Sequence, residues 1–377
     1  MKIIADSDIP FIEDAFKEFG DIITVPGIEI NNNLIKDASI LIVRSITRVN
    51  EDLLKNTRIK FVGTTSPDTD HIDTHYLSEN FIGFANAPGS NAESVAEYVI
   101  SAVLALIDNK NIPFNEYTIG VIGVGKVGSR VLEKCTTLGI RCLLNDPFKE
   151  RQTQSYIYLT LDEVLKKSDI ITLHVPFTTT EPDQTHHLVN AEFLNKMKDG
   201  ALFINTSNSN VINEEQFCRT APGKLKGVAI DTWETDPHIN LELLKITNIA
   251  TPHIAGCSYI SNVIGTGMIH AAACAYFFKE PSWDFDRVIE QLPCKTIQIS
   301  NTKNPIPEAI AKTYLIFDDD KMFRSISTIN QSEQGQYFNN LRKNYPGRNS
   351  FSLCKIKSDD LTLDTVEWLA QLGFRIW

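Results

Sequence analysis

The chain has 377 residues, more than a single hydrophobic core usually organises, and we therefore expect two or three domains. Its 42% hydrophobic and 22% charged residues are typical of a globular protein and exclude a mainly disordered or fibrous chain. A formal net charge of -11 argues against nucleic acid or an anionic membrane as the main partner, because neutralising phosphates requires clustered Lys and Arg.

Membrane and secretion signals are not apparent in the sequence. No apolar run approaches the roughly 20 residues of a membrane helix, and Asp6 comes too early for a signal peptide. The seven cysteines are scattered without a CxxC pair, and we interpret them as reduced thiols rather than as disulfides or metal ligands. We expect a cytoplasmic protein without a metal site.

The first part of the chain alternates short apolar runs with amphipathic stretches. The apolar runs predict buried strands at residues 3–4, 22–25, 40–43, 61–62 and 81–85. Residues 11–19 and 51–55 have helical periodicity, and this alternation is typical of a parallel α/β sheet. Residues 91–107 then predict a long connecting helix.

A second α/β series follows the connecting helix. It contains predicted strands at residues 118–122, 141–145, 170–174, 202–205, 228–231 and 249–251. Six strands fit a complete dinucleotide-binding sheet. Residues 259–278 predict a helix that leaves this series.

The character of the sequence changes after Pro281. Short strand candidates at 296–299, 313–317 and 351–356, with a closing helix at 363–372, predict a small α+β unit. The predicted fold is α/β, with two Rossmann-like, doubly wound parallel-sheet domains and a small C-terminal α+β domain.

A glycine-rich loop joins the strand at 118–122 to a helix predicted at 126–138. Gly123 permits the tight turn, Gly125 lets the backbone approach a pyrophosphate, and Gly128 lets the helix and strand pack closely. We predict that this loop binds NAD through Gly123, Gly125, Lys126, Val127 and Gly128.

Asp146 ends the next predicted strand. A carboxylate there accepts hydrogen bonds from the adenosine ribose and repels a 2′-phosphate, which favours NAD over NADP. The alternative is a turn aspartate before Pro147, and the nearby Lys149 and Arg151 leave NADP open.

Three later segments, 204–208, 231–237 and 251–256, each begin where a predicted strand ends. Sheets of this kind place their chemistry at the carboxyl ends of the strands. Oxidation of a secondary alcohol needs a base for the hydroxyl proton, and imidazole has a suitable pKa. We predict His253 as this base and Asp236 as the carboxylate that orients it, the alternative being a structural histidine.

The other histidines are weaker candidates for a site. His71 and His75 are predicted to share a helix face, and His186 and His187 are predicted to lie in a loop. No cysteine or acid near them completes a metal site.

With these motifs, the chain resembles the D-2-hydroxyacid dehydrogenase family over nearly its whole length. Further matching segments are Val-Arg-Ser at 43–45, Lys-Phe-Val-Gly-Thr at 60–64, residues 86–92 and Leu-Arg-Lys-Asn-Tyr at 341–345. The resemblance implies a substrate-binding lid domain of residues 1–92 completed by 257–280, an NAD-binding domain of residues 93–256, and a C-terminal dimerisation domain of residues 281–377. It also implies NAD as cofactor, a small phosphorylated 2-hydroxy acid as substrate, and a homodimer.

The resemblance implies roles for single residues as well. Ser45 and Ser66 match substrate-binding positions, and Cys257 stands where the family has a substrate-binding tyrosine. The family's cofactor-binding positions correspond to Val175, Thr206, Ser207, Asn208, Asp231 and Gly256.

The chain departs from the family at two members of its catalytic trio of Arg, Glu and His. His253 is retained, Asp236 replaces the glutamate, and Asn208 replaces the arginine. Asp236 is still a carboxylate able to orient an imidazole. The arginine grips the substrate carboxylate with a planar cation, which Asn208 lacks, and losing one such donor costs on the order of 10²–10³ in rate.

Two hypotheses follow from Asn208. Substrate recognition has been rebuilt, with Arg44, Arg48 or an arginine of a partner chain supplying the cation, or catalysis has decayed while NAD binding persists in a regulatory or scaffolding protein. A dehydrogenase for a different 2-hydroxy acid is the alternative among active enzymes. The basic cluster Arg342, Lys343 and Arg348 is interpreted as a solvated face rather than as a site for a substrate phosphate.

Overall fold

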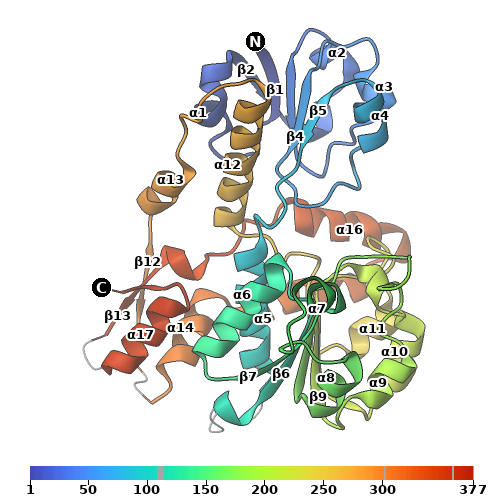
Figure 1. The fold of residues 1–377 in the computed structure, drawn as a ribbon, viewed down its shortest axis with the longest axis vertical. Coiled ribbons are helices and arrows are strands. Elements are labelled where there is room, and N and C mark those ends of the chain that lie inside the picture. The colour runs from blue at the N-terminus through green and yellow to red at the C-terminus, as the bar shows by residue number, and fades with distance from the viewer. Residues whose placement is uncertain (108–113, 301–302, 359–360, 377) are drawn as a thin grey trace. The chain divides into compact units, whose positions relative to one another are not determined.

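The computed structural model describes residues 1–107, 114–300, 303–358 and 361–376. The chain forms two compact units. Unit 1 consists of Met1–Asn91 and Ser258–Pro293, and unit 2 consists of Ala92–Cys257 and Cys294–Trp377. The colour scale of Figure 1 identifies the segments of each unit by residue number.

Unit 1 is built on a parallel five-stranded sheet with the order β2-β1-β3-β4-β5. Its strands are β1 (Lys2–Asp6), β2 (Asp21–Val25), β3 (Ile40–Val43), β4 (Phe61–Thr64) and β5 (Gly83–Ala85). Every residue of β3 and β4 is buried, as expected for a parallel sheet that is covered on both faces.

Helices cover both faces of this sheet. They are α1 (Ile12–Phe16), η1 (Lys17–Phe19), η2 (Gly27–Glu29), α2 (Asn32–Ile35), α3 (Glu51–Leu54), α4 (Thr74–Glu79), α12 (Tyr259–Tyr276) and α13 (Phe285–Gln291). Side chains alternate across β3: Ile40 and Ile42 pack with α1 and α12, whereas Leu41 and Val43 pack with α2, α3 and α4.

The prediction that His71 and His75 share a helix face is wrong. Asp73 accepts a hydrogen bond from the Tyr76 N–H and so begins α4 at Thr74, after His71. The His71 ring instead lies 2.9 Å from the Thr64 hydroxyl at the end of β4.

Unit 2 contains a six-stranded parallel sheet with the order β11-β10-β9-β8-β6-β7, which confirms the predicted dinucleotide-binding architecture. The strands are β6 (Thr118–Ile122), β7 (Arg141–Asn145), β8 (Ile170–Leu173), β9 (Ala201–Asn205), β10 (Leu225–Ile230) and β11 (Ile249–Ala250). The strand order reverses between β6 and β8, and this is where open α/β sheets bind ligands.

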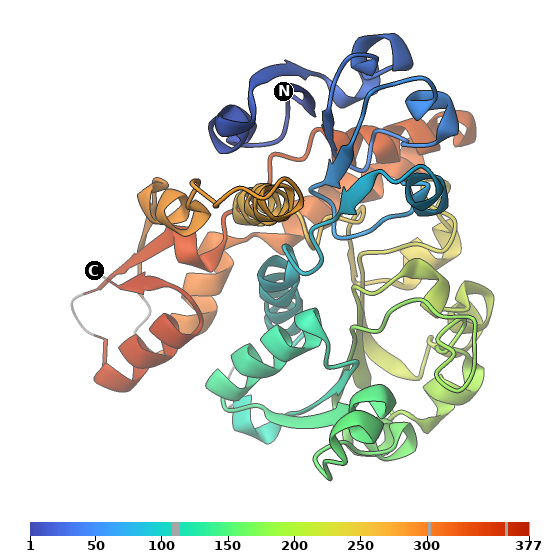
Figure 2. The ribbon, with the colours of Figure 1, turned by 45° about the horizontal axis from the view of Figure 1, so that its top comes forward.

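The helices around this sheet are mostly short. They are α5 (Ala92–Leu106), η3 (Phe114–Glu116), α6 (Lys126–Thr137), α7 (Pro147–Thr153), α8 (Leu161–Lys167), α9 (Ala191–Lys196), η4 (Ser209–Val211), α10 (Glu214–Thr220) and α11 (Leu241–Ile246). The two longest, α5 and α6, lie side by side in Figures 1 and 2.

The C-terminal part of unit 2 has a parallel three-stranded sheet with the order β12-β13-β14. Its elements are β12 (Lys295–Gln298), α14 (Pro305–Thr313), α15 (Ile316–Arg324), η5 (Ser325–Thr328), α16 (Gln331–Lys343), η6 (Phe351–Leu353), β13 (Cys354–Lys357), α17 (Leu363–Gln371) and β14 (Arg375–Ile376). Side chains from β12, α14 and η6 share one hydrophobic core with α5.

The strand predicted at residues 313–317 is wrong. Thr313 ends α14 and Ile316 begins α15. The apolar run packs inward from the helix ends, where the Tyr314 ring lies 6.2 Å from the Tyr98 ring of α5.

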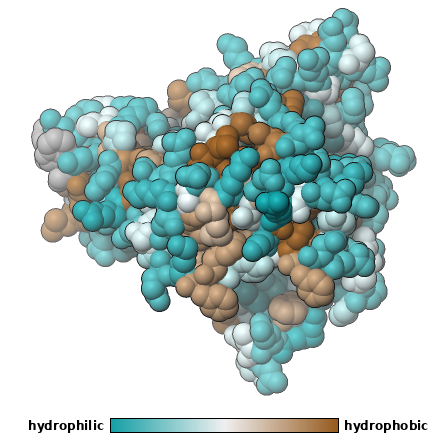
Figure 3. All heavy atoms as spheres, turned by 90° about the horizontal axis from the view of Figure 1, so that it is seen from above, coloured by the Kyte–Doolittle hydropathy of each residue, from teal (hydrophilic) through white to brown (hydrophobic). Residues whose placement is uncertain are grey.

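Over the described ranges, none of the helices is both long and apolar enough to cross a membrane. The face shown in Figure 3 is largely hydrophilic, with scattered hydrophobic patches. Exposed hydrophobic side chains of this kind are normal for a globular protein.

Candidate active site

The loop between β6 and α6 has the backbone that its glycines predict. Gly123 has a φ of +83°, which an L side chain rarely adopts. A Cβ on Gly128 would lie 2.0 Å from the Gly123 carbonyl oxygen, so only glycine lets α6 pack this closely on the loop. Apart from its own chain neighbours, a Cβ on Gly125 would meet no atom of the described residues within 4 Å. The space at Gly125, beside the positive end of α6, therefore fits the pyrophosphate of a dinucleotide.

Asp146 stands at the end of β7, next to this loop. Its two carboxylate oxygens accept hydrogen bonds from the Lys149 N–H and the Val124 N–H, each at 2.9 Å. Asp146 thus begins α7 and also holds the glycine loop. The Lys149 ammonium donates to the Val124 carbonyl, and Arg151 pairs with Asp183. Lys149 and Arg151, the two cations that could bind the 2′-phosphate of NADP, are therefore both paired with groups of this chain.

The ends of β8 and β9 are tied together by hydroxyl groups. The Val175 N–H donates to the Ser207 hydroxyl at 3.1 Å. The His174 ring lies between the hydroxyls of Thr172, at 2.9 Å, and Thr206, at 3.4 Å. Burial lowers the pKa of His174 to about 3, so this ring is neutral at physiological pH and does not act as a base.

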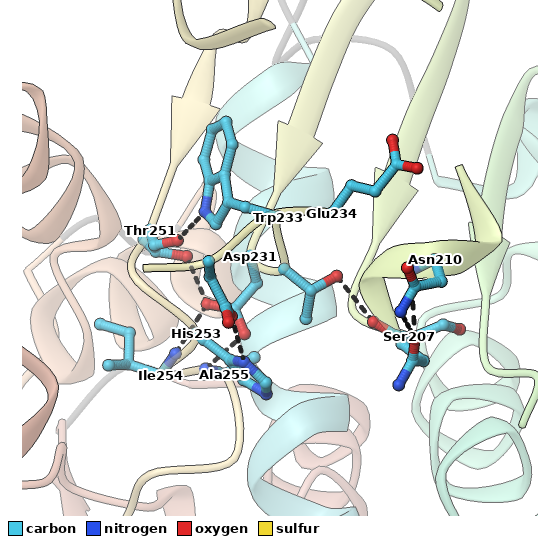
Figure 4. A network of polar contacts seen from close by, with 12 residues as sticks. Ser207, Asn210, Asp231, Trp233, Glu234, Thr251, His253, Ile254 and Ala255 are labelled. Carbon is cyan, nitrogen blue, oxygen red and sulfur yellow. Dashed lines mark hydrogen bonds and ion pairs between the residues drawn. The ribbon is translucent and has the colours of Figure 1, made fainter. Parts of the chain in front are cut away.

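Asn208 is exposed at the start of η4. Its carboxamide oxygen accepts hydrogen bonds from the Asn210 N–H at 3.0 Å and from the Asn210 side chain at 3.2 Å (Figure 4). Asn208 therefore caps the turn that follows β9, and it offers a ligand an amide rather than a cation.

Asp231 is a buried hub for the segment that carries His253 (Figure 4). One of its carboxylate oxygens accepts hydrogen bonds from the Thr251 hydroxyl at 2.6 Å and the Ile254 N–H at 2.8 Å. The other accepts the Ala255 N–H at 2.9 Å. The resemblance implied that Asp231 contacts the cofactor, and in this structure its carboxylate accepts these three hydrogen bonds from the chain itself.

His253 and Asp236 come together as predicted. The His253 Nδ1 lies 3.3 Å from an Asp236 carboxylate oxygen, and the His253 N–H donates to the Asp231 carbonyl at 2.7 Å. Burial on its own would raise the pKa of Asp236, but its hydrogen bond and charge interaction with His253, together with the charge of Arg342, lower that pKa. The His253 side chain is 40% exposed, which leaves its Nε2 open to a ligand.

The substrate candidates of unit 1 follow the ends of its strands. Arg44, directly after β3, forms ion pairs with Asp6 at the end of β1 and with Asp8. Ser45 is exposed, and the Ser66 hydroxyl accepts a hydrogen bond from the Asp68 N–H at 3.3 Å. Arg44 is thus neutralised by two carboxylates, whereas Arg48 is an exposed arginine of the same loop.

Arg348 is a residue of this region that the sequence analysis misjudged. It is buried, which contradicts its interpretation as part of a solvated face. Its guanidinium donates to the carbonyls of Ser94, Ile254 and Ala255, and its N–H donates to the Cys257 carbonyl. In the sequence, the one indication of a role for Arg348 was its position just after the segment 341–345.

The arrangement in unit 2 defines a class of protein. A glycine loop shaped for a dinucleotide lies on the same sheet edge as a histidine whose Nδ1 is held by a carboxylate. Such a pair can take a proton from an alcohol while hydride leaves for a nicotinamide. This is the site of a nicotinamide-dependent dehydrogenase.

Comparisons with known proteins agree with this class. Residues 108–255 match the family described as D-isomer specific 2-hydroxyacid dehydrogenase, NAD binding domain, and residues 289–373 match a domain of unknown function, DUF3410. The erythronate-4-phosphate dehydrogenase of Photorhabdus laumondii is 35% identical over 99% of both chains. The protein of the same name from Salinibacter ruber is 35% identical over 92% of both.

A solved structure shares the fold. The crystal structure of D-lactate dehydrogenase from Aquifex aeolicus, complexed with NAD and lactic acid, has 28% sequence identity and a TM-score of 0.58, and the match covers 74% of this chain and 96% of that one. This chain belongs to the D-isomer specific 2-hydroxyacid dehydrogenase family and is one of its NAD-binding enzymes.

Proposed function

We propose that this enzyme oxidises 4-phospho-D-erythronate to 2-oxo-3-hydroxy-4-phosphobutanoate with NAD, a step of pyridoxal 5′-phosphate (vitamin B6) biosynthesis. The observation that carries the proposal is the His253–Asp236 pair at the sheet edge of a chain that matches proteins named erythronate-4-phosphate dehydrogenase over 99% of its length. The C-terminal segment is part of that match, and this favours the proposal over a dehydrogenase for another 2-hydroxy acid.

The chemistry needs one proton acceptor and one hydride acceptor. The Nε2 of His253 takes the proton of the C2 hydroxyl, while Asp236 holds the Nδ1–H and stabilises the resulting imidazolium. Bound NAD supplies the nicotinamide that accepts the hydride from C2. The C2–H and O–H bonds break, and the carbon–oxygen bond becomes the new carbonyl.

NAD rather than NADP is the proposed cofactor. Asp146 would face the 2′-hydroxyl of the adenosine ribose, and its negative charge disfavours a 2′-phosphate. The partners of Lys149 and Arg151 support this choice, because neither side chain is left as a dedicated phosphate ligand.

Because Asn208 replaces the family's arginine, an activity assay must decide whether the enzyme is active or has lost catalysis. Purified protein is incubated with NAD and 4-phospho-D-erythronate, or with other D-2-hydroxy acids, and NADH is followed by absorbance. Turnover of 4-phospho-D-erythronate at the highest kcat/KM supports the proposal. Tight NAD binding without turnover of any substrate would leave a non-catalytic NAD-binding protein.

The reverse substitution Asn208→Arg is the sharper test. A site that has rebuilt its substrate contacts, with Arg48 or an arginine of a partner chain supplying the cation, loses rate or stays unchanged in Asn208→Arg. A decayed site gains rate. Ser209→Ala, at the neighbouring position of η4, is the control for disturbance of the turn.

We further propose that the protein is a homodimer formed through its C-terminal segment. Leu315 and Phe317, near the start of α15, and Trp368 on α17 are large exposed hydrophobic side chains of this segment. Light scattering at micromolar concentration is expected to give twice the mass of the chain. A monomer that is fully active would contradict the dimer but not the dehydrogenase.

A further inference from the structure

Unit 1 contains a cluster of three side chains that the dehydrogenase mechanism does not use. Glu18 lies in η1, and His270 and Cys274 lie one turn apart on α12. One ligand atom from each lies within 4.8 Å of the other two. The two α12 residues are buried, and the Glu18 side chain is 22% exposed.

The distances in this cluster are close to those of a zinc centre. Tetrahedral zinc with bonds of about 2.3 Å to sulfur and about 2.0 Å to nitrogen or oxygen separates its ligand atoms by about 3.3–3.6 Å. Cys274 Sγ lies 3.5 Å from His270 Nε2 and 3.8 Å from Glu18 Oε1. Only the 2.7 Å distance between His270 Nε2 and Glu18 Oε1 must widen to admit an ion.

The donor set also balances the charge of a divalent cation. A thiolate and a carboxylate together cancel two positive charges, and the neutral imidazole completes three protein ligands, so a water reaching the site past Glu18 can be the fourth. Two further charges lie near the cluster. The Lys279 ammonium donates to the Glu18 carbonyl at 3.0 Å and its charge lowers the pKa of Cys274, whereas the negative charge of Glu280 raises that pKa. These two charges oppose each other.

The metal-free chain has its own stable arrangement. The His270 Nε2 lies 2.7 Å from a Glu18 carboxylate oxygen, and the aromatic rings of Phe16, Phe19 and Trp283 surround the imidazole. Burial, followed by the nearby Glu18, raises the pKa of Cys274 to about 11, so without a cation the thiol stays protonated. A cation must therefore displace a thiol proton, and its binding strengthens with pH.

We propose that Glu18, His270 and Cys274 bind one zinc ion that joins η1 to α12 and stabilises unit 1. The zinc site belongs to unit 1, whereas the glycine loop and His253 belong to unit 2. The sequence hides it because 252 residues separate Glu18 from His270.

The test compares the untagged full-length protein with Cys274→Ser and Glu18→Gln. Each protein is stripped with a chelator, equilibrated with Zn²⁺, freed of excess ion, and analysed for zinc by mass spectrometry. We expect the wild type to retain one equivalent more than either variant. Cys218→Ser, which changes a partly buried cysteine of α10 in unit 2, should retain as much as the wild type.

Two further readouts keep the test decisive. Zn²⁺ should raise the melting temperature of the wild type and of Cys218→Ser but not of Cys274→Ser. Co²⁺ should give a thiolate charge-transfer band in the same two proteins alone. The variants leave every other histidine unchanged, including the stacked pair His186–His187, so only the difference in zinc between the proteins counts. Equal zinc retention and equal melting shifts in the wild type, Cys274→Ser and Glu18→Gln would overturn the proposal. If Glu18→Gln alone retains zinc like the wild type, the three-ligand site is wrong.

Discussion

Two glycines of the loop between β6 and α6 serve different purposes. An added Cβ on Gly125 would lie in open space, with no atom of the described part of the chain within 4 Å except in its chain neighbours. A Cβ on Gly128 would collide with the Gly123 carbonyl. We expect Gly125→Ala to keep its stability but bind NAD about 10-fold or more weakly, because the methyl group occupies the space of the ligand. We expect Gly128→Ala to lose about 1–3 kcal/mol of unfolding free energy.

Thermal melts without ligand and calorimetric titration with NAD measure the two effects separately. The contrast depends on which substitution lowers the melting temperature of the ligand-free protein. A marked loss of stability in Gly125→Ala, with none in Gly128→Ala, would contradict this account of the loop.

Asp236 is expected to act through the His253 ring. Its pKa is lowered, so it stays ionised at neutral pH and favours the imidazolium that forms during oxidation. Asp236→Asn should lower kcat by roughly 10²-fold, within the range for general acid–base catalysis, while leaving NAD affinity unchanged. Asp236→Glu restores the carboxylate and should recover most of the rate. Steady-state kinetics of both variants, with His253→Asn as reference, check this; equal rates for Asp236→Asn and Asp236→Glu would show that the charge is not what matters.

At the residue scale, the sequence predicts the role of a side chain when that role depends on its position directly after a strand. His253 and Asp236 lie after neighbouring strands, and the rule that chemistry gathers at strand ends brings them together. The sequence does not predict that Asp231 is filled by donors from residues 251–255, or that Asn208 caps η4, because both depend on how loops close on themselves. Arg348 is less predictable still, since its carbonyl partners lie more than 90 residues away.

At the scale of elements, Arg348 connects the segment after α16 to the loop that carries His253. Its guanidinium donates to the Ile254 and Ala255 carbonyls and lies 5.1 Å from the centre of the Tyr314 ring. Arg348→Met leaves buried carbonyls without donors and should cost about 3–5 kcal/mol of unfolding free energy.

Kinetic measurements on an Arg348 variant can show whether this residue positions the loop that carries His253 or only stabilises the fold. We expect Arg348→Lys, which keeps the charge but not the fork of donors, to remain folded and to lower kcat more than it raises KM. Lys343→Met, an exposed change at the end of α16, is the matched control. An Arg348→Lys enzyme with wild-type kcat would show that the loop keeps its geometry without these hydrogen bonds.

Glu97 on α5 is expected to make the free energy of unfolding depend on pH. Burial raises its pKa from 4.5 to about 7, and among the described residues one of its carboxylate oxygens has no hydrogen-bond partner. Between these two pKa values the folded state holds a proton that the unfolded state releases, so the free energy of unfolding falls as the pH rises from 4.5 to about 7. The loss is at most about 3 kcal/mol. Denaturant titrations across this range should show a shallower decline for Glu97→Gln, and parallel curves for the two proteins would refute the assignment.

Element prediction succeeded where one periodicity dominates and failed where packing decides. The central strands β6, β8 and β9 are mainly apolar runs, and α6 begins at the glycine loop, so these elements follow from the local pattern. The run at 313–317 contains the same residue types as a strand. It forms helix ends because Tyr314 packs against α5, a contact over more than 200 residues that no local window contains.

At the scale of the whole molecule, the C-terminal segment is part of the core of unit 2. Buried side chains on both sides form one cluster: Val95, Val99 and Val103 of α5 with Ile297, Ile306, Ile310 and Phe351. The face of α5 that the segment covers is apolar, as expected for a helix face that is buried against other elements.

Truncation after Pro293 tests this integration. Removing residues 294–377 uncovers the apolar face of α5 and removes Arg348 from the carbonyls beside His253. We expect the truncated protein to aggregate or to melt far below the full chain and to lose NAD binding, because the glycine loop and α5 belong to the same unit. The full-length Lys343→Met protein, which changes the segment only at its surface, should behave as the wild type. A truncated protein that stays monodisperse and binds NAD with wild-type affinity would mean that residues 294–377 are an appendage, and that α5 is stable without the cover they provide.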